Sequence, residues 1–195
     1  MGLYLYGSGG HAKVVLEIAE VLKLNIEGFV DDYAENKFLF NYPIYSSNNS
    51  YRNEEWIIAI GDNSIRKKIA NKLSGTFPTL IHPSANISKR CLVNEGTVIM
   101  AGVTVNSSVI IGRHVILNTN SSIDHDCIIE DYVHVSPNVA IAGNVKVGEC
   151  THLGIGCCII QGVSVGRNCI VGAGAVVIRD VPDGTKVVGN PSKKI

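Results

Sequence analysis

A histidine between two carboxylates is the group in this chain best suited to catalysis. His125 lies between Asp124 and Asp126. A carboxylate bonded to one imidazole nitrogen fixes the tautomer and raises the basicity of the ring, which suits a general base near neutral pH. The plainer alternative is a surface histidine in a turn, and the spacing alone leaves that alternative open. We predict that His125 is a general base beside an acid.

A glycine-rich turn near the N-terminus is the second chemical feature. Residues 7–12 read Gly-Ser-Gly-Gly-His-Ala, which fits G-x-G-x-x-A between an apolar strand and a helical pattern. Glycines let a backbone approach a pyrophosphate, and a helix N-terminus offers N–H donors. Asp31 and Asp32 follow roughly twenty residues later, where an acid can hold a ribose or a base edge. A tight turn without a ligand is the alternative.

The size of this segment limits the ligand. About eighty residues are too few for both mononucleotide halves of an NAD site. A single nucleotide, such as the diphosphate of a nucleotide-sugar, fits better. The residues predicted around it are Gly9, Gly10, His11, Asp31 and Asp32.

The remaining histidines and the cysteines carry weaker signals. His134 is placed to donate a hydrogen bond, although a simple edge residue is equally consistent with its position. His82 precedes a proline and is expected to be structural, whereas His114 and His152 have no local acid and are expected at the surface. Four of the six cysteines stand where valine, threonine and alanine stand elsewhere in a repeat, so they are predicted to act as small apolar residues. No metal site is predicted.

That repeat positions the histidines. Residues 81–182 divide into six-residue units whose first residue is always Ile, Leu or Val and whose fifth residue is always small. A six-residue apolar period fits neither a helix nor a hairpin sheet, and it is typical of a parallel β-helix. Three units close one triangular coil, and adjacent coils lie roughly 4.8 Å apart. First-position side chains are expected to point inward and stack.

Residues eighteen apart therefore lie one above another. His125 stacks under Gly143, and His134 under His152. Asn118 begins a column that continues through Ser136 and then becomes glycine. We expect a groove there, with exposed backbone N–H groups beside polar side chains.

The first eighty residues follow a different pattern. Strands are expected at residues 3–6, 26–30 and 56–60, with helices after the glycine turn and over residues 65–73. The second helix is expected to carry Arg66, Lys67 and Lys68 on its solvent side. Residues 34–54 are expected to form an irregular connection with one short strand near residues 43–45. Alternating strands and helices predict a small parallel sheet with helices on its faces.

Composition excludes several classes of protein. Hydrophobic residues make up 46% of the 195 residues and charged residues 17%, which predicts a globular chain. The formal net charge is zero, so nothing attracts a nucleic acid electrostatically. No apolar run approaches the ~20 residues of a membrane span. The first residues lack the features of a signal peptide, so we expect a cytoplasmic protein.

Together these motifs carry a resemblance to a known family. The glycine turn, Asp31-Asp32, residues 60–66, the Ile81-His82-Pro83 segment, residues 118–126 and the Val188-Gly189-Asn190-Pro191 tail together resemble the PglD-type nucleotide-sugar acetyltransferases and their NeuD-type relatives. The resemblance covers essentially the whole chain. It implies a small Rossmann-like α/β domain over residues 1–80, followed by a left-handed parallel β-helix over residues 81–195.

The resemblance also implies roles for particular residues. It implies a homotrimer with active sites between neighbouring β-helices, in which the N-terminal domain binds a UDP-sugar and acetyl-CoA lies along the β-helix. His125 would be the general base and Asp126 its supporting acid, at a position where glutamate is expected in the family. Coenzyme contacts are expected at His134, Gly143, Ile155 and Ala173, and further substrate contacts at Gly61 and Asn118.

We therefore predict acetyl-CoA-dependent N-acetylation of a nucleotide-linked deoxy-amino sugar, most simply at C4 of a UDP-sugar, by direct transfer in a ternary complex. A backbone N–H, that of Gly143, would stabilise the oxyanion. O-acetylation of sialic acid or a related sugar is the alternative. A zinc-dependent β-helix enzyme of the γ-carbonic anhydrase kind, with His125, His134 and His152 as ligands, leaves the N-terminal domain without a purpose. A non-catalytic β-helix used for assembly would bind no acetyl-CoA.

Overall fold

The computed structural model describes residues 2–47 and 54–195. The N-terminal part contains one six-stranded sheet in the order β3-β4-β2-β1-β5-β6, in which every neighbouring pair is parallel except β3 and β4. Its elements are β1 (Leu3–Tyr6), α1 (Gly10–Val21), β2 (Ile26–Val30), β3 (Phe38–Leu39), β4 (Tyr42–Tyr45), β5 (Glu54–Ile58), α2 (Asn63–Ala70) and β6 (Gly75–Thr76). β4 fulfils the expected short strand, and residues 48–53 of the expected connection lie outside the described residues.

Two helices, α1 and α2, follow strands of this sheet and pack beside it. α1 buries Ala12, Val15, Leu16, Ile18 and Ala19. α2 begins after Asp62, whose side chain accepts a hydrogen bond from the N–H of Ile65 at 2.9 Å. The expectation that Arg66 faces solvent is wrong, because Arg66 is 1% exposed and finds hydrogen-bond acceptors in other parts of the chain. None of the helices in the described residues is both long and apolar enough to span a membrane.

From residue 80 onward the chain forms a parallel solenoid, which matches the left-handed β-helix type. From β7 to β23 each strand pairs with strands eighteen residues away, as Val98 does with Leu80 and Ile116, so three strands complete a coil. At the C-terminal end β24 pairs parallel with β22 at a spacing of sixteen residues, and β25 pairs antiparallel with β24. The strands are β7 (Leu80–Ile81), β8 (Asn86–Ile87), β9 (Leu92–Val93), β10 (Val98–Ile99), β11 (Thr104–Val105), β12 (Ile110–Ile111), β13 (Ile116–Leu117), β14 (Ser122–Ile123), β15 (Ile128–Ile129), β16 (His134–Val135), β17 (Ala140–Ile141), β18 (Lys146–Val147), β19 (His152–Leu153), β20 (Cys158–Ile159), β21 (Ser164–Val165), β22 (Ile170–Val171), β23 (Val176–Val177), β24 (Lys186–Val188) and β25 (Lys193–Lys194).

The solenoid has three faces. Face 1 contains β7, β10, β13, β16, β19, β22, β24 and β25; face 2 contains β8, β11, β14, β17, β20 and β23; face 3 contains β9, β12, β15, β18 and β21. We name each corner by the faces it joins. The fourth residue of most units takes a left-handed backbone conformation that turns the chain at the corner, as at Asn120 (φ 58°) and Asp126 (φ 60°). Asparagine, aspartate and glycine adopt this conformation most readily, which explains their frequency there.

The interior follows the six-residue frame. First-position residues such as Ile111 and Leu117 and fifth-position residues such as Val115 and Cys127 are fully buried in one continuous core. This confirms the inward stacking predicted from the repeat. The buried Cys127, Cys157 and Cys169 pack as small apolar residues in that core.

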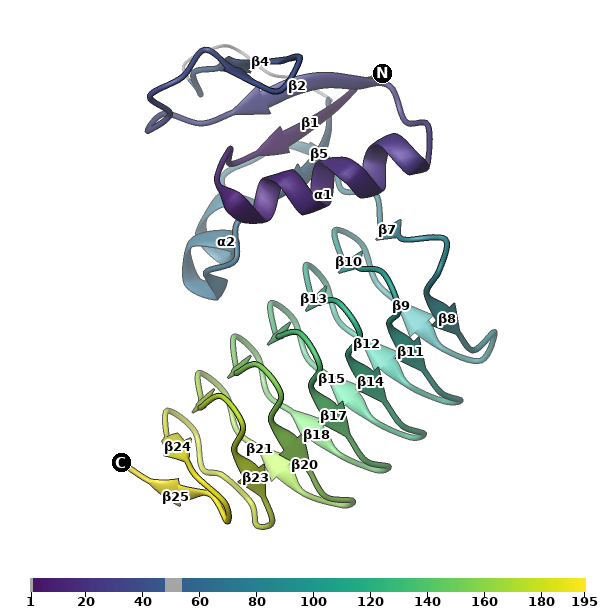
Figure 1. Cartoon of the computed structure of the whole chain (residues 1–195), viewed down its shortest axis with the longest axis vertical. Coiled ribbons are helices and arrows are strands. Elements are labelled where there is room, and N and C mark those ends of the chain that lie inside the picture. Colours follow the sequence, from purple (N-terminus) through teal and green to yellow (C-terminus); the bar gives the residue numbers. More distant parts are fainter. Residues whose placement is uncertain (1, 48–53) are drawn as a thin grey trace.

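The N-terminal part is packed onto face 1. Figure 1 shows α1 lying between the N-terminal sheet and the first coils of the solenoid. Leu80, Val98 and Ile116 of face 1 share a buried cluster with Leu5 and Val15 of the N-terminal part. The two parts therefore form one continuous apolar contact, which fixes the glycine-rich turn relative to the solenoid.

Candidate active site

A cavity of about 470 Å³ opens at the N-terminus of α1. Residues 7–11 form one wall, and we call the cavity the glycine-turn pocket. The other lining residues are Tyr6, Asp31, Asp32, Tyr33, Ala59, Ile60, Gly61, Ile65 and Ile69. Gly9 and Gly10 have open space where a side chain would stand, so their backbone is accessible to a ligand. The predicted Gly9, Gly10, His11, Asp31, Asp32 and Gly61 therefore meet in one place.

The two acids of this pocket organise its loops. The carboxylate of Asp31 accepts hydrogen bonds from the N–H (2.8 Å) and hydroxyl (2.7 Å) of Ser8 and from the N–H of Tyr33 (3.0 Å). Asp32 accepts from Ser46 and from the N–H and hydroxyl of Ser47, and these bonds to Ser47 lower its pKa. A carboxylate has about four acceptor positions. Within the described residues three of these positions are used at each acid, which leaves about one for a ligand hydroxyl or base.

His11 adds a polar atom without a partner. Its Nε2 is buried and has no hydrogen bond within the described part of the chain. Burial lowers its pKa to about 4, with a further contribution from the charge of Arg66. His11 is therefore neutral at pH 7.

His134 joins the pocket to the solenoid. Asn118 Oδ1 accepts the N–H of Thr119, so the amide nitrogen of Asn118 faces His134 Nε2 at 3.2 Å. Nε2 must then accept, and His134 Nδ1–H donates to the carbonyl of Gly61 at 3.1 Å. Burial lowers the pKa of His134 to about 3, in agreement with a neutral ring. Both nitrogens are thus used within the chain, so neither is free for a ligand.

His125 has the arrangement of a general base. Its Nδ1 lies 2.8 Å from Asp126 Oδ2, and this hydrogen bond raises the pKa of the imidazole. Nδ1 therefore carries the proton, and Nε2 is left to accept one. A Cβ built on Gly143 would stand 2.6 Å from His125 Cε1, so the ring lies directly over bare backbone. The Gly143 N–H has no hydrogen-bond partner among the described residues.

Within one chain, the His125–Asp126 pair and the other predicted site residues lie at different places around the prism. His125, Asp126 and Gly143 lie at the corner between faces 2 and 3, and this corner is opposite face 1 in a triangular section. Asn118 lies at the corner between faces 1 and 2, and His134 lies on face 1 under the N-terminal part. Ile155 and Ala173 are exposed at the corner between faces 1 and 2. The predicted residues therefore form three groups around the prism.

Several polar residues differ from the sequence prediction. His114 was expected at the surface, but it is 3% exposed and stacks on Tyr132 at 5.3 Å between ring centroids. His152 is half-buried, 3.2 Å from the Ser136 hydroxyl and 4.8 Å between centroids from the ring of His134. Only tertiary contact with α2 and face 1 buries them, so no local signal marks them. No group of three or more potential metal ligands occurs within residues 2–47 and 54–195.

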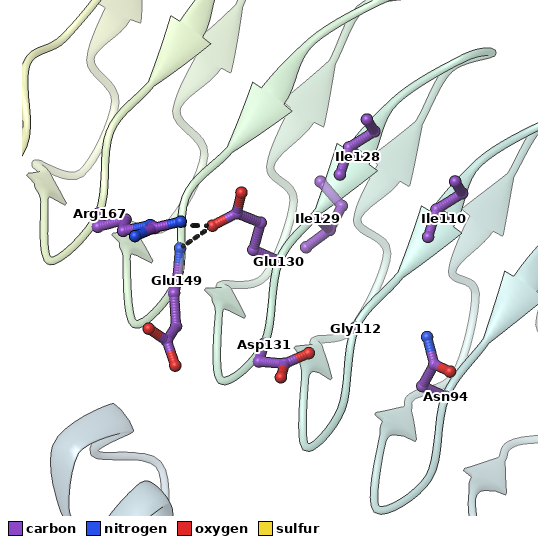
Figure 2. Close-up of a pocket in the computed structure, with 9 residues that line it drawn as sticks. All are labelled: Asn94, Ile110, Gly112, Ile128, Ile129, Glu130, Asp131, Glu149 and Arg167. Carbon is purple, nitrogen blue, oxygen red and sulfur yellow. Dashed lines mark hydrogen bonds and ion pairs between the residues drawn. The ribbon is translucent and has the colours of Figure 1, made fainter.

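A second groove, of about 370 Å³, lies along face 3 and its corner with face 1. Figure 2 shows Glu130 at its centre, bonded to Arg167 (3.4 Å) and to the backbone N–H of Glu149 (3.0 Å). Lys146 also pairs with Glu130 at 3.0 Å. These charges are already paired, and neither His125 nor the glycine turn lines the groove.

Comparison with known proteins identifies similar chains. Residues 2–73 match the PglD N-terminal domain family. The acetyltransferase domain of PglB from Neisseria gonorrhoeae, in complex with acetyl coenzyme A, is 35% identical with a TM-score of 0.94, covering 100% of this chain and 98% of that one. A mutant of perosamine N-acetyltransferase from Caulobacter crescentus, in complex with CoA and GDP-perosamine, is 35% identical with a TM-score of 0.94, covering 100% and 97%.

A curated relative is similar over a shorter stretch. UDP-N-acetylbacillosamine N-acetyltransferase of Bacillus subtilis (strain 168) is 38% identical over 108 residues, which is 50% of this chain and 50% of that protein. The match thus spans about half the length of that relative.

Proposed function

The chain belongs to the PglD-type hexapeptide-repeat sugar acetyltransferases, and from this premise we propose that it transfers an acetyl group from acetyl-CoA to the amino group of a nucleotide-linked sugar. The membership confirms the resemblance predicted from the sequence. The observation that carries the proposal is the His125–Asp126 pair standing over the bare backbone of Gly143. Such a pair can remove a proton beside a backbone N–H that faces the reacting carbonyl.

The acceptor we propose is the C4 amino group of a UDP-linked deoxy-amino sugar. The relative from Bacillus subtilis is named for a UDP-sugar, and the protein from Caulobacter crescentus binds GDP-perosamine. Both names specify an N-acetyltransferase, which favours an amine over the hydroxyl of the O-acetylation alternative. These acids do not select one nucleobase, since Asp31 and Asp32 each retain only about one acceptor position.

The proposed mechanism is direct transfer with both substrates bound. The amine nitrogen attacks the thioester carbonyl carbon, and the resulting oxyanion accepts a hydrogen bond from the N–H of Gly143. His125 Nε2 takes the proton from the nitrogen, while Asp126 stabilises the imidazolium through Nδ1–H. Collapse of the intermediate breaks the C–S bond, and the CoA thiolate regains the proton from His125. Holding both substrates in one groove removes much of the entropic barrier.

A homotrimer would complete this site. The glycine-turn pocket lies against face 1, whereas His125 lies at the opposite corner, so we propose that His125 of one copy serves the pocket of the next. Ile155 and Ala173 would then line the coenzyme groove facing a neighbour's Gly143. Short outward side chains such as Ser122 and Ala140 on face 2 would let copies approach closely. Ala140→Arg should therefore abolish both the trimer, measured by light scattering, and the activity.

The test of function is a thiol-release assay with acetyl-CoA and paired UDP- and GDP-linked sugars that carry either an amine or a hydroxyl at C4. We expect turnover with the amine, and a loss of about 10²–10⁴-fold in kcat for His125→Ala. Turnover only with hydroxyl sugars would favour O-acetylation. Near-normal kcat in His125→Ala would show that another group is the base.

A further inference from the structure

Arg66 is a fully buried cation that lies between the N-terminal part and the solenoid. Its side chain is 1% exposed, and its five N–H donors meet five acceptors. Nε donates to the carbonyl of His114 at 2.8 Å, and Nη1 donates to those of Ile60 (3.0 Å) and Gly61 (3.1 Å). Nη2 donates to Asn63 Oδ1 and to the Tyr132 carbonyl, each at 2.8 Å.

None of these acceptors is a carboxylate, and four are backbone carbonyls. A guanidinium presents five donors in a fixed plane. Matching all five therefore requires a defined position of each carbonyl. An ammonium has three donors on a flexible stem and cannot reproduce this pattern. Arg66 therefore fixes the positions of these acceptors more than it neutralises a negative charge.

The acceptors come from two parts of the chain that must be aligned. Ile60 and Gly61 line the glycine-turn pocket, whereas His114 and Tyr132 belong to successive coils at the corner between faces 3 and 1. Asn63 extends the connection by donating to the carbonyls of Cys150 (3.0 Å) and Thr151 (3.1 Å) in the next coil.

The Gly61 carbonyl is where this network meets the substrate-facing residues. It accepts from Arg66 Nη1 and from His134 Nδ1, both at 3.1 Å. His134 in turn holds Asn118. A shift of Gly61 would therefore move the pocket rim relative to the coils that carry Asn118 and His134.

We propose that Arg66 is a positioning residue, which sets the rim of the glycine-turn pocket at a fixed height on the solenoid so that the sugar reaches the acetyl group. This rests on the proposed function, because it assigns the nucleotide to that pocket. Arg66 does not line the glycine-turn pocket, so a diphosphate bound at the turn and α1 would not contact it. Nucleotide binding should thus survive its loss, while alignment of the sugar should not.

The test is Arg66→Lys in the full-length protein. We expect kcat with the amino sugar to fall about 10²-fold, the effect of roughly 1 Å of misplacement. The Kd values for the free nucleoside diphosphate and for CoA should stay within about threefold, with full CoA stoichiometry. Lys67→Met is the matched control, since it breaks the neighbouring Lys67–Glu149 bridge (2.7 Å) across the same interface and should leave kcat unchanged.

Asn63→Ala covers the case in which Arg66→Lys does not fold. It removes one acceptor of Arg66 and both bonds to the carbonyls of Cys150 and Thr151. We expect kcat to fall about tenfold, as for a smaller misplacement, while both Kd values are retained. A folded variant with kcat near the wild-type value would overturn the role of Arg66, as would a loss of kcat matched by equal losses of nucleotide and CoA binding. If the wild type turns over no nucleotide-linked amino sugar, the proposed function itself fails.

Discussion

Adding one methyl group at Gly143 should disable the catalytic base without unfolding the protein. The Cβ of Gly143→Ala would stand 2.6 Å from Cε1, 2.8 Å from Nε2 and 3.1 Å from Nδ1 of His125. Contacts this short do not persist, so the imidazole must move. Its side chain is 60% exposed and can rotate into solvent, but it then loses the 2.8 Å bond to Asp126.

The two expected magnitudes differ strongly. The φ of Gly143 lies outside the left-handed region, so alanine fits the backbone, and the free energy of unfolding should change by less than about 1 kcal/mol. General-base catalysis contributes about 10²–10⁴-fold. The barrier should therefore rise by about 3–5 kcal/mol. Urea unfolding measures the change in the free energy of unfolding, and initial rates of thiol release measure the change in the barrier.

A double-mutant cycle isolates the mechanism. In a His125→Ala background the added methyl group has no imidazole to displace, so Gly143→Ala should cost almost nothing further. Gln161→Ala, one coil above in the same column, is the control and should retain activity. If Gly143→Ala keeps kcat within about threefold of wild type, the methyl group does not displace the base. If its cost is the same in both backgrounds, the methyl group acts on the coenzyme or on the Gly143 N–H and not on His125.

Two further predictions concern pH. In Asp126→Asn the pKa of His125 should fall toward its ordinary value, because the bond to Asp126 is the main cause of the increase; the acidic limb of a kcat–pH profile should move to lower pH while the maximum falls at least about tenfold. An unmoved limb would show that another group titrates. Burial, aided by Arg66, lowers the pKa of His114 to about 4. The unfolded chain therefore binds that proton more tightly, and stability present above pH 6.5 is lost as the pH falls toward 4. His114→Asn, which tolerates the left-handed conformation there (φ 53°), should reduce the loss of unfolding free energy between pH 7 and pH 5 by up to about 2 kcal/mol in urea titrations; an unchanged slope would exclude His114 as the cause.

The local features of the site were accessible from the sequence. The six-residue frame predicts that His125 stacks against Gly143, and the structure places the imidazole ring against that glycine. Adjacency in the sequence predicts the contact between His125 and Asp126. Both are consequences of the repeat, because residues within one turn or eighteen apart have fixed relations.

Arg66 was not accessible in the same way. Three basic residues in a row on a helix usually face solvent, and Lys67 and Lys68 fit that expectation better than Arg66. The acceptors that bury Arg66 include carbonyls 48 and 66 residues away, at His114 and Tyr132. Backbone carbonyls have no sequence signature, since every residue carries one. A buried arginine held by carbonyls is therefore invisible to reasoning from side-chain types.

The choice of the covered face shows a related limit of a periodic sequence. The outward residue before each first position is apolar in the lower coils of two faces: Leu80, Val98 and Ile116 on face 1, and Leu92, Ile110 and Ile128 on face 3. The sequence presents the two columns as equivalent sites for the N-terminal part. In the structure the first column is 1% exposed at each position, whereas the second is 55%, 44% and 40% exposed. The two columns differ in the residues above them. Face 1 continues with His134, which bonds to Gly61, whereas face 3 continues with Lys146, which pairs with Glu130 of its own solenoid. Apolar area alone would fit either face. The entry of the chain into the solenoid at β7 on face 1 and the polar contacts at the His134 end both favour face 1.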